Sequence, residues 1–200
     1  AAALGTTGVI TPEGETYGSL TTPDPVTLHQ TLDRLARDRV THLAMEASSH
    51  GLDQRRLEGV RLSAAAFTNL SRDHLDYHSD LDSYLAAKLR LFETLLAPGQ
   101  PAVIDADADV AARVVAACAA RGLRVFTTGA KGDFLKLVSA QARPASTLVR
   151  IACDGAMHDI ELPLAGAFMA SNALVAAGLC IATGSPAASV LEALGPILRG

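Results

Sequence analysis

The chain has 200 residues, 49% apolar and 19% charged, which is enough for one full hydrophobic core and too little for two large ones. Seventeen Lys and Arg against 21 Asp and Glu give a net charge of −4 without a basic block, which argues against nucleic acid or an anionic membrane as main partner. The three cysteines lie far apart without a C-x-x-C pair, which argues against a disulfide framework or thiolate zinc site and indicates a reducing cytoplasm.

The first part of the chain predicts a strand, a hairpin arm and a helix. Residues 5–10 read as a short strand and residues 15–20 as the hairpin arm that follows a turn. Asp24 can cap a helix that begins at Pro25, because proline is tolerated at the first helical position. Three leucines supply the buried face of this helix: Leu28, Leu32 and Leu35.

Short apolar runs then alternate with patterns of helical spacing. The runs are 42–47, 63–68 and 102–105, and the helical patterns are 81–96 and 110–120. This alternation predicts an α/β fold with a mostly parallel sheet flanked by helices. Residues 124–162 predict a smaller strand-rich part, and two helices are expected near 168–182 and 187–194.

Residues 162–190 contain no charge, and a run of that length is long enough to span a bilayer. Pro163, Gly166, Gly184 and Pro186 interrupt the run, so a buried helix is expected instead of a membrane span. No charged region precedes an apolar run at the start, so a secretory signal is not expected.

Three predicted strands are followed at once by polar residues. These are residues 46–50, Asn69 with Asp73 and His74, and residues 105–107. Because loops open at the carboxyl ends of parallel strands, we expect the three segments to converge.

Lys88 occupies an unusual position for a charged residue. It lies within an apolar stripe at helical spacing formed by Leu81, Leu85, Leu89, Phe92 and Leu96. A buried ammonium must be paired, deprotonated or chemically changed, because an isolated buried charge is costly. One alternative is that Lys88 extends along its stem into solvent. The other is that carbon dioxide carbamylates its amine, which turns a cation into a carboxylate that can hold a metal.

His74 and His78 are four residues apart and have acidic neighbours. With Asp73 they form a candidate metal or acid–base cluster, although the pattern is not H-E-x-x-H. The alternative is a structural role in turn hydrogen bonding.

Three longer motifs resemble, in order and spacing, the central domain of the Mur ligases. They are A-M-E-A-S-S-H-G-L at 44–52, F-T-N-L-S-R-D-H-L-D-Y-H at 67–78 and Y-L-A-A-K at 84–88. T-T-P at 21–23 and G-A-F with S-N-A at 166–173 also fit, so the resemblance runs from about Gly5 to Gly195. Within the family, the chain is most similar to members that add the third amino acid of the peptidoglycan peptide.

The resemblance implies a metal site and a ligand site. Glu46 corresponds to a magnesium-binding glutamate, His74 to a ligand of a second magnesium ion, and Lys88 to a lysine whose carbamate helps to hold that ion. The family's contacts to the UDP-muramoyl dipeptide fall on Thr21, Thr22, Ser48, Gln54 and Arg56. Asn172 corresponds to an asparagine that hydrogen-bonds adenine.

Each of these positions also has a structural alternative. Glu46 can accept hydrogen bonds from backbone N–H groups, and Thr21 and Thr22 can form a turn before a helix. Ser48 can cap a helix. Arg56 can be a solvated charge, and Asn172 can bridge helices.

The implied activity is that of an ATP-dependent, amide-forming ligase of cytoplasmic peptidoglycan synthesis, and so of cell-wall biogenesis, cell shape and division. ATP phosphorylates the side-chain carboxylate of D-glutamate, and an amine of diaminopimelate or lysine attacks the acyl phosphate. Phosphoryl transfer depends on charge neutralisation and positioning, which suits the two Mg²⁺ ions that the resemblance implies. The implied partners are the UDP-muramoyl dipeptide, ATP and the diamino acid.

The sequence also departs from the family pattern. It contains no G-x-x-x-x-G-K-[ST] phosphate loop, and the amino-terminal and carboxyl-terminal domains of the family are missing. We therefore expect residues 1–200 to form a single central domain that is truncated at its amino terminus, lacks the phosphate loop and is inactive alone. The choice between diaminopimelate and lysine is expected to lie in the missing last domain.

Three other functions stay open at this point. They are a related ligase such as folylpolyglutamate synthetase (FPGS), a metal-dependent hydrolase built on Asp73, His74 and His78, and a non-catalytic Mur-like interaction module.

Overall fold

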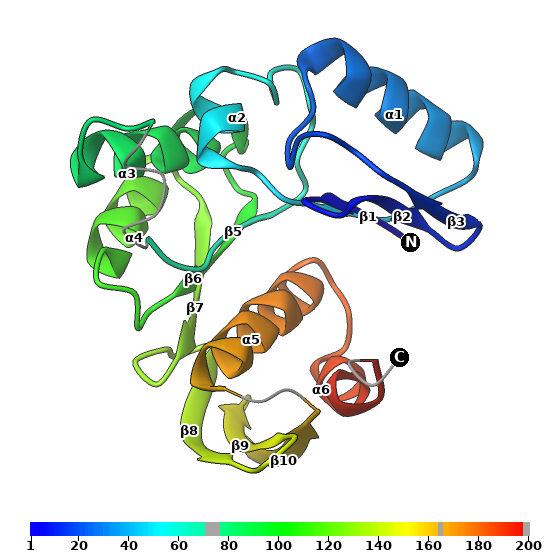
Figure 1. Cartoon of the computed structure of the whole chain (residues 1–200). Helices are drawn as coiled ribbons and strands as arrows, with labels where there is room; N and C mark the ends of the chain where they lie inside the picture. Colours follow the sequence, from blue (N-terminus) through cyan, green and yellow to red (C-terminus); the bar gives the residue numbers. More distant parts are fainter. Residues whose placement is uncertain (71–76, 164–165, 198–200) are drawn as a thin grey trace. The chain divides into compact units, whose positions relative to one another are not determined.

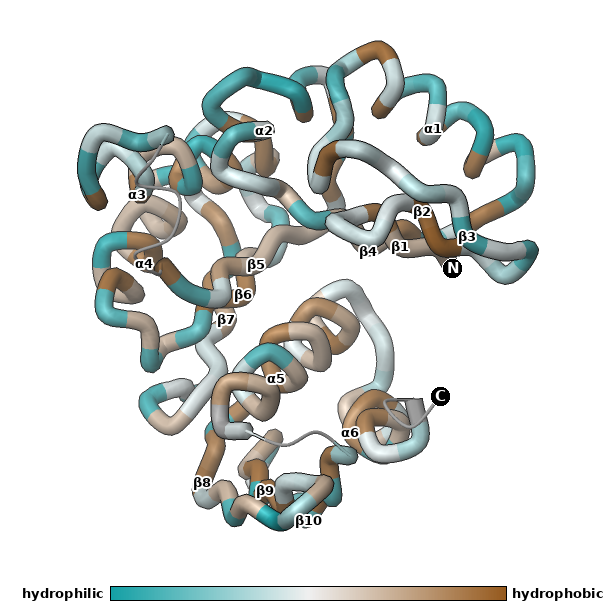
Figure 2. Tube along the Cα trace, viewed as in Figure 1, coloured by the Kyte–Doolittle hydropathy of each residue, from teal (hydrophilic) through white to brown (hydrophobic). Residues whose placement is uncertain are grey.

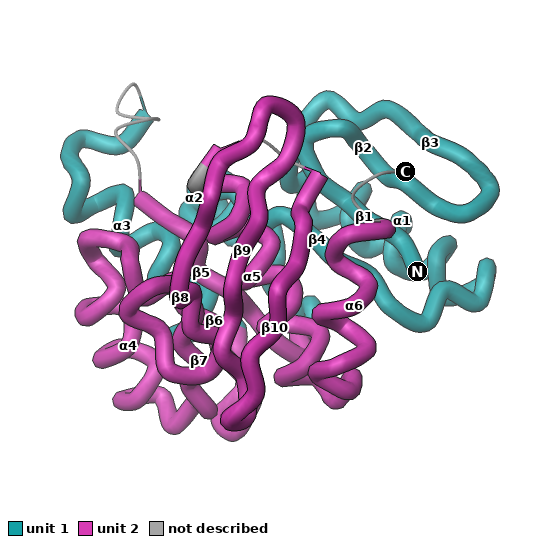
Figure 3. The backbone as a smooth tube through the Cα atoms, turned by 90° about the horizontal axis from the view of Figure 1, so that it is seen from below, with its two compact units in different colours: residues 1–61, 72–95 teal, residues 62–71, 96–200 magenta. Residues whose placement is uncertain are grey.

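The computed structural model describes residues 1–70, 77–163 and 166–197 (Figure 1). The chain divides into two compact units. Unit 1 comprises Ala1–Arg61 and Arg72–Leu95, and unit 2 comprises Leu62–Ser71 and Leu96–Gly200 (Figure 3).

Unit 1 contains a four-stranded sheet in the order β3-β2-β1-β4. Its strands are β1 (Ala2–Gly5), β2 (Gly8–Thr11), β3 (Gly14–Thr16) and β4 (Leu43–Met45). The first three strands are antiparallel, whereas β4 lies parallel to β1. The predicted single strand over 5–10 is wrong, because the chain turns at Thr6 and Thr7 and Gly8 adopts a positive φ of 97°.

Helix α1 (Pro25–Arg37) begins where the sequence predicts. The Asp24 carboxylate accepts hydrogen bonds from Val26 N at 3.0 Å and Thr27 N at 3.1 Å, which satisfies two N–H groups of the first turn. Leu28 and Leu35 are buried, and Leu32 is half-buried. The predicted apolar face of this helix is therefore confirmed.

Two further helices complete unit 1: α2 (Ser49–Asp53) and α3 (Leu81–Arg90), which continues into a π-helical turn, η1 (Leu91–Leu95). Asp80 and Ser83 form a reciprocal capping box at the start of α3. Leu85 and Phe92 are fully buried, as the stripe predicts. Leu81 departs from the prediction because it lies in the first turn and is 42% exposed.

Unit 2 contains a six-stranded sheet in the order β10-β9-β8-β7-β6-β5. Its strands are β5 (Ala65–Phe67), β6 (Pro101–Asp105), β7 (Arg124–Gly129), β8 (Leu135–Ala142), β9 (Thr147–Cys153) and β10 (Ala156–Leu162). Strands β5 to β8 are parallel and β8 to β10 are antiparallel. This confirms the mostly parallel sheet and the strand-rich part at 124–162. Since β4 belongs to the four-stranded sheet, the premise that residues 46–50 and 105–107 follow strands of one parallel sheet is wrong.

Helices cover this sheet: α4 (Ala111–Ala120) packs on β6 and β7, α5 (Ala167–Ala182) packs on β5 to β9, and α6 (Ala187–Ile197) packs on α5 and β10. A Cβ atom on Gly178 of α5 would lie 2.8 Å from Val103 Cγ1, so this glycine permits close helix–sheet contact. Figure 2 shows α5 as hydrophobic over most of its length, in agreement with the predicted buried helix. None of the helices in the described ranges is both long and apolar enough to cross a bilayer.

Candidate functional site

Glu46 directly follows β4 and meets the turn between β1 and β2. Glu46 N donates to Leu4 O at 2.9 Å, which continues the sheet pairing by one residue. Its Oε2 accepts hydrogen bonds from Thr6 Oγ1 at 2.9 Å and Thr6 N at 3.2 Å. A Cβ atom on Gly5 would lie 2.6 Å from Glu46 Cδ, so only glycine leaves room for this position of the carboxylate. The carboxylate is exposed, and its Oε1 makes no hydrogen bond with the described residues.

Thr21 and Thr22 connect this carboxylate to α2. The Thr21 hydroxyl lies 3.1 Å from Thr6 Oγ1. The Thr22 hydroxyl donates to Glu46 O at 2.9 Å and accepts from Ser48 N at 3.0 Å and Ser48 Oγ at 3.1 Å. A hydroxyl group has one donor and two acceptor positions. These three bonds therefore use every hydrogen-bonding position of the Thr22 hydroxyl. Thr22 is fully buried, whereas Thr21 and Ser48 are half-exposed.

Ser48 caps α2, which is the structural role given above as the alternative to a ligand contact. Its Oγ accepts a hydrogen bond from Gly51 N at 3.1 Å. A Cβ atom on Gly51 would lie 2.7 Å from Thr22 Cβ, which explains a glycine inside this short helix. The S-S-H-G motif thus holds α2 against the T-T-P segment.

Gln54 and Arg56 follow α2 and bind each other. Arg56 Nε and Nη2 donate to Gln54 Oε1 at 3.1 and 2.6 Å, and Arg56 Nη1 donates to Thr22 O at 2.7 Å. These bonds exclude a merely solvated Arg56. They use three of the five guanidinium N–H donors, so two donors remain for an anionic ligand. Gln54 Nε2 donates to Tyr77 Oη at 3.3 Å, and Tyr77 Oη donates to Asp53 Oδ2 at 2.8 Å.

Lys88 lies in α3 one turn after Tyr84. Its Nζ is 5.2 Å from the centroid of the Tyr84 ring, which stacks on His78 with ring centroids 4.9 Å apart. Burial lowers the pKa of the Lys88 ammonium below its ordinary value, because the charged form loses hydration. A larger share of the nucleophilic neutral amine is therefore present at any given pH.

The predicted nucleotide contact, Asn172, lies in unit 2, exposed in the second turn of α5. The preceding residue, Ser171, donates a short hydrogen bond to Asp105, which ends β6. Asp105 Oδ1 accepts from Asp107 N at 3.0 Å, and the Asp107 carboxylate accepts from Ala130 N at 2.6 Å. The Asp105 side chain at the end of β6 thus binds α5, and the Asp107 carboxylate links the ends of β6 and β7.

The structure joins six of the predicted site residues through one hydrogen-bonded network in unit 1: Thr21, Thr22, Glu46, Ser48, Gln54 and Arg56. His74 and Asp73 lie outside the described residues, so the convergence of Glu46, His74 and Lys88 stays a prediction. Among the described residues, no cluster of three or more His, Cys, Asp or Glu side chains is arranged to hold a metal.

Two residues of this network, Thr6 and Tyr77, and a third residue of the same unit, Arg90, were not predicted from the sequence. Thr6 lies in residues 5–10, which the sequence predicts only as a strand. Tyr77 lies in the D-Y-H string, in which only the histidines form a predicted site. Arg90 follows Lys88 by two residues, and its Nε and Nη2 bind Leu52 O and Glu58 Oε1 at 3.0 and 2.7 Å. The last residue of an amphipathic helix gives no local sign of such a partner.

The two sheets and the helices that pack on them define an α/β protein. The Mur ligase middle domain model matches residues 1–180, and the chain therefore belongs to the Mur ligase family.

Two known proteins show how closely the chain follows this family. It is 55% identical over 194 residues to the UDP-N-acetylmuramoyl-L-alanyl-D-glutamate--2,6-diaminopimelate ligase of Agrobacterium fabrum, which covers 97% of this chain and 40% of that protein. A solved structure of a ligase of the same name superposes with a TM-score of 0.86 at 29% identity, covering 98% of this chain and 40% of the other. The chain thus spans about 40% of the length of the curated relatives it matches.

A more distant match concerns the FPGS alternative. An FPGS–AMPPCP complex superposes with a TM-score of 0.60 at 14% identity, covering 97% of this chain and 56% of the other. At that identity the match shows a shared fold alone.

Proposed function

We propose that this chain is the central domain of a longer cytoplasmic ligase that uses ATP to join 2,6-diaminopimelate to UDP-N-acetylmuramoyl-L-alanyl-D-glutamate. The observation that carries the proposal is the network that links Glu46, Thr22, Ser48 and Arg56, because it joins an exposed carboxylate to side chains with donors suited to an anionic ligand. The 55% identity to a diaminopimelate ligase supports the choice of this amino acid over lysine. The relatives' greater length supports flanking domains that supply the missing phosphate loop and the binding sites for uridine and the amino acid.

In this proposal the dipeptide binds along the carboxyl end of α2. Arg56 offers a fixed cation with two N–H donors left over, which suits a carboxylate or phosphate. Thr21, Ser48 and Gln54 add hydroxyl and amide groups within the same network. Thr22 is also a predicted contact; with its hydroxyl saturated, it acts in this conformation by holding Ser48 and Arg56 in place.

Magnesium and a carbamylated Lys88 form the second part of the proposal. Glu46 presents an exposed carboxylate with an unused oxygen, which is the hard donor that Mg²⁺ prefers. Glu46 would hold one ion, and His74 with the Lys88 carbamate would hold the other. Bound Mg²⁺ neutralises phosphate charge during phosphoryl transfer.

The carbamate forms when the neutral Lys88 amine attacks the carbon of CO₂, electrons move onto oxygen and the nitrogen loses one proton. The lowered pKa of Lys88 favours this step.

The proposed reaction has two chemical steps, phosphoryl transfer and amide formation. Asn172 would hydrogen-bond the adenine of ATP. The γ-phosphoryl group passes to the D-glutamate side-chain carboxylate, with ADP as leaving group. The diaminopimelate amine attacks the acyl carbon, phosphate leaves and the amine proton is released. The protein's part is to orient the carboxylate and exclude competing water, which is how binding energy lowers such barriers.

Carbamylation of Lys88 can be tested directly in the complete ligase. This chain contains three lysines, Lys88, Lys131 and Lys136, so a second lysine of the same domain can serve as the control. Lys131 and Lys136 are exposed. In ¹³C-bicarbonate we expect a carbamate resonance that Lys88→Arg removes and Lys136→Arg retains. Lys88→Ala is expected to lose most activity and to regain part of it with added bicarbonate or a short carboxylic acid.

Full activity of the Lys88→Ala ligase would refute the role of the carbamate. For the 200-residue chain alone, ATP-dependent amide formation would refute the proposal that it needs a phosphate loop from outside.

A further inference from the structure

The carboxyl end of α2 forms a tight turn that carries two predicted dipeptide contacts, Gln54 and Arg56. Arg56 N donates to Gly51 O at 2.8 Å, and Arg55 N donates to Leu52 O at 3.2 Å. This pair of bonds is a Schellman motif, in which the residue of left-handed conformation is usually glycine. Here that residue is Arg55, with a φ of 57°. A side chain with a Cβ atom disfavours this conformation, so the turn depends on contacts from elsewhere.

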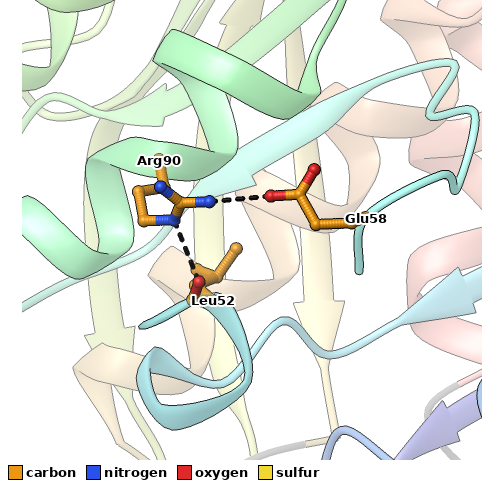
Figure 4. Close-up of polar contacts among 3 residues, drawn as sticks. All are labelled: Leu52, Glu58 and Arg90. Carbon is orange, nitrogen blue, oxygen red and sulfur yellow. Dashed lines mark hydrogen bonds and ion pairs between the residues drawn. The ribbon is translucent and has the colours of Figure 1, made fainter. Parts of the chain in front are cut away.

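Arg90, the last residue of α3, provides such contacts on both sides of the turn (Figure 4). Its Nε donates to Leu52 O at 3.0 Å, the carbonyl that also accepts from Arg55 N. Its Nη2 donates to Glu58 Oε1 at 2.7 Å. The Arg90 side chain is 25% exposed, so solvent screens these bonds less than those of a surface pair.

We propose that Arg90 is a positioning residue for the dipeptide: it holds the turn that presents Gln54 and Arg56. This rests on the proposed function, because it assumes that the two side chains contact the dipeptide. Arg90 and Lys88 lie on the same helix, so α3 carries the amine to be carbamylated and also secures the dipeptide-binding turn. Arginine suits the role because its planar guanidinium offers two donors at fixed spacing, which a lysine ammonium does not.

The test uses the complete ligase and separates binding of the two substrates. Arg90→Ala is expected to raise the KM for UDP-muramoyl dipeptide about tenfold, equivalent to about 1.4 kcal/mol, and to change the KM for ATP less than about twofold. Arg90→Lys keeps an ion pair with Glu58 but loses the bond to Leu52 O, so we expect a rise of about threefold. Arg37→Ala is the matched control, because Arg37 pairs with Asp33 at 2.7 Å on the surface of the same unit.

A second readout does not depend on activity. Amide hydrogen exchange of peptides that contain residues 52–58 is expected to speed up in Arg90→Ala and to stay unchanged in Arg37→Ala. A purely structural role would instead lower the yield of active enzyme with both KM values unchanged. If Arg90→Ala does not fold, the test uses Arg90→Lys instead, through its KM for the dipeptide and the amide hydrogen exchange of residues 52–58.

An unchanged dipeptide KM in Arg90→Ala overturns the inference. If Gln54→Ala and Arg56→Ala still raise that KM, the proposed function stands and only the role of Arg90 fails. If neither of them raises it, the assignment of the turn to the dipeptide fails as well.

Discussion

Thr22→Val tests whether a buried hydroxyl holds the candidate site together. Valine keeps the shape of threonine but removes one donor and two acceptor positions. Glu46 O then loses a bond of 2.9 Å and Ser48 N loses one of 3.0 Å. Each unpaired, partly buried group costs about 1–2 kcal/mol, whereas Ser48 Oγ can turn toward water. We therefore expect unit 1 to lose about 3 kcal/mol of stability.

Tyrosine fluorescence during urea unfolding of the chain measures this loss. The chain has no tryptophan, and its three tyrosines, at positions 17, 77 and 84, all lie in unit 1. The signal therefore follows the unit that contains Thr22, which matters because two units need not unfold together. With a slope of about 1.5 kcal/mol per molar urea, the expected shift of the midpoint is about 2 M.

Two neighbouring variants make the result specific. Thr22→Ser keeps the hydroxyl and loses only a methyl group, so we expect a loss of about 1 kcal/mol. Thr21→Val removes a single half-exposed bond to Thr6 and should cost less than about 0.5 kcal/mol. If Thr22→Val is no more destabilising than Thr21→Val, the reasoning about the saturated hydroxyl is refuted.

Two further predictions concern the same unit. Gly5→Ala should displace the end of the Glu46 side chain, which can rotate away at a cost in stability below about 1 kcal/mol. The displaced carboxylate should nevertheless raise the Mg²⁺ concentration that the complete ligase needs for activity. An unchanged Mg²⁺ titration of the variant contradicts this prediction. Hydrogen bonds from Ser83 lower the pKa of the Asp80 carboxyl below its usual 3.8. These bonds therefore stabilise the folded protein fully above pH 3.8, and this stabilisation is lost as the pH falls through the lower pKa of the folded state. Urea midpoints at pH 5 and pH 3 should therefore differ more in the wild type than in Asp80→Asn, and equal differences would exclude a role for this cap.

The sequence by itself determined the features whose cause lies within one or two helical turns. The Asp24 cap and the leucines of α1 follow from local hydrogen bonding and a period of 3.6 residues. The same is true of Ser48 at the start of α2. The motifs at 44–52, 67–78 and 84–88 also identified the family, since their residue types and order are specific.

Only the tertiary structure decided which distant segments pair. Strand β4 has three residues, too few for its apolar pattern to select a neighbour, and it pairs with β1 in a separate sheet. Thr6 reaches Glu46 across 40 positions, and Arg90 reaches Leu52 across 38. Such contacts depend on where the backbone passes after the core has packed, because a side chain's own neighbours in sequence carry no record of a partner that far away.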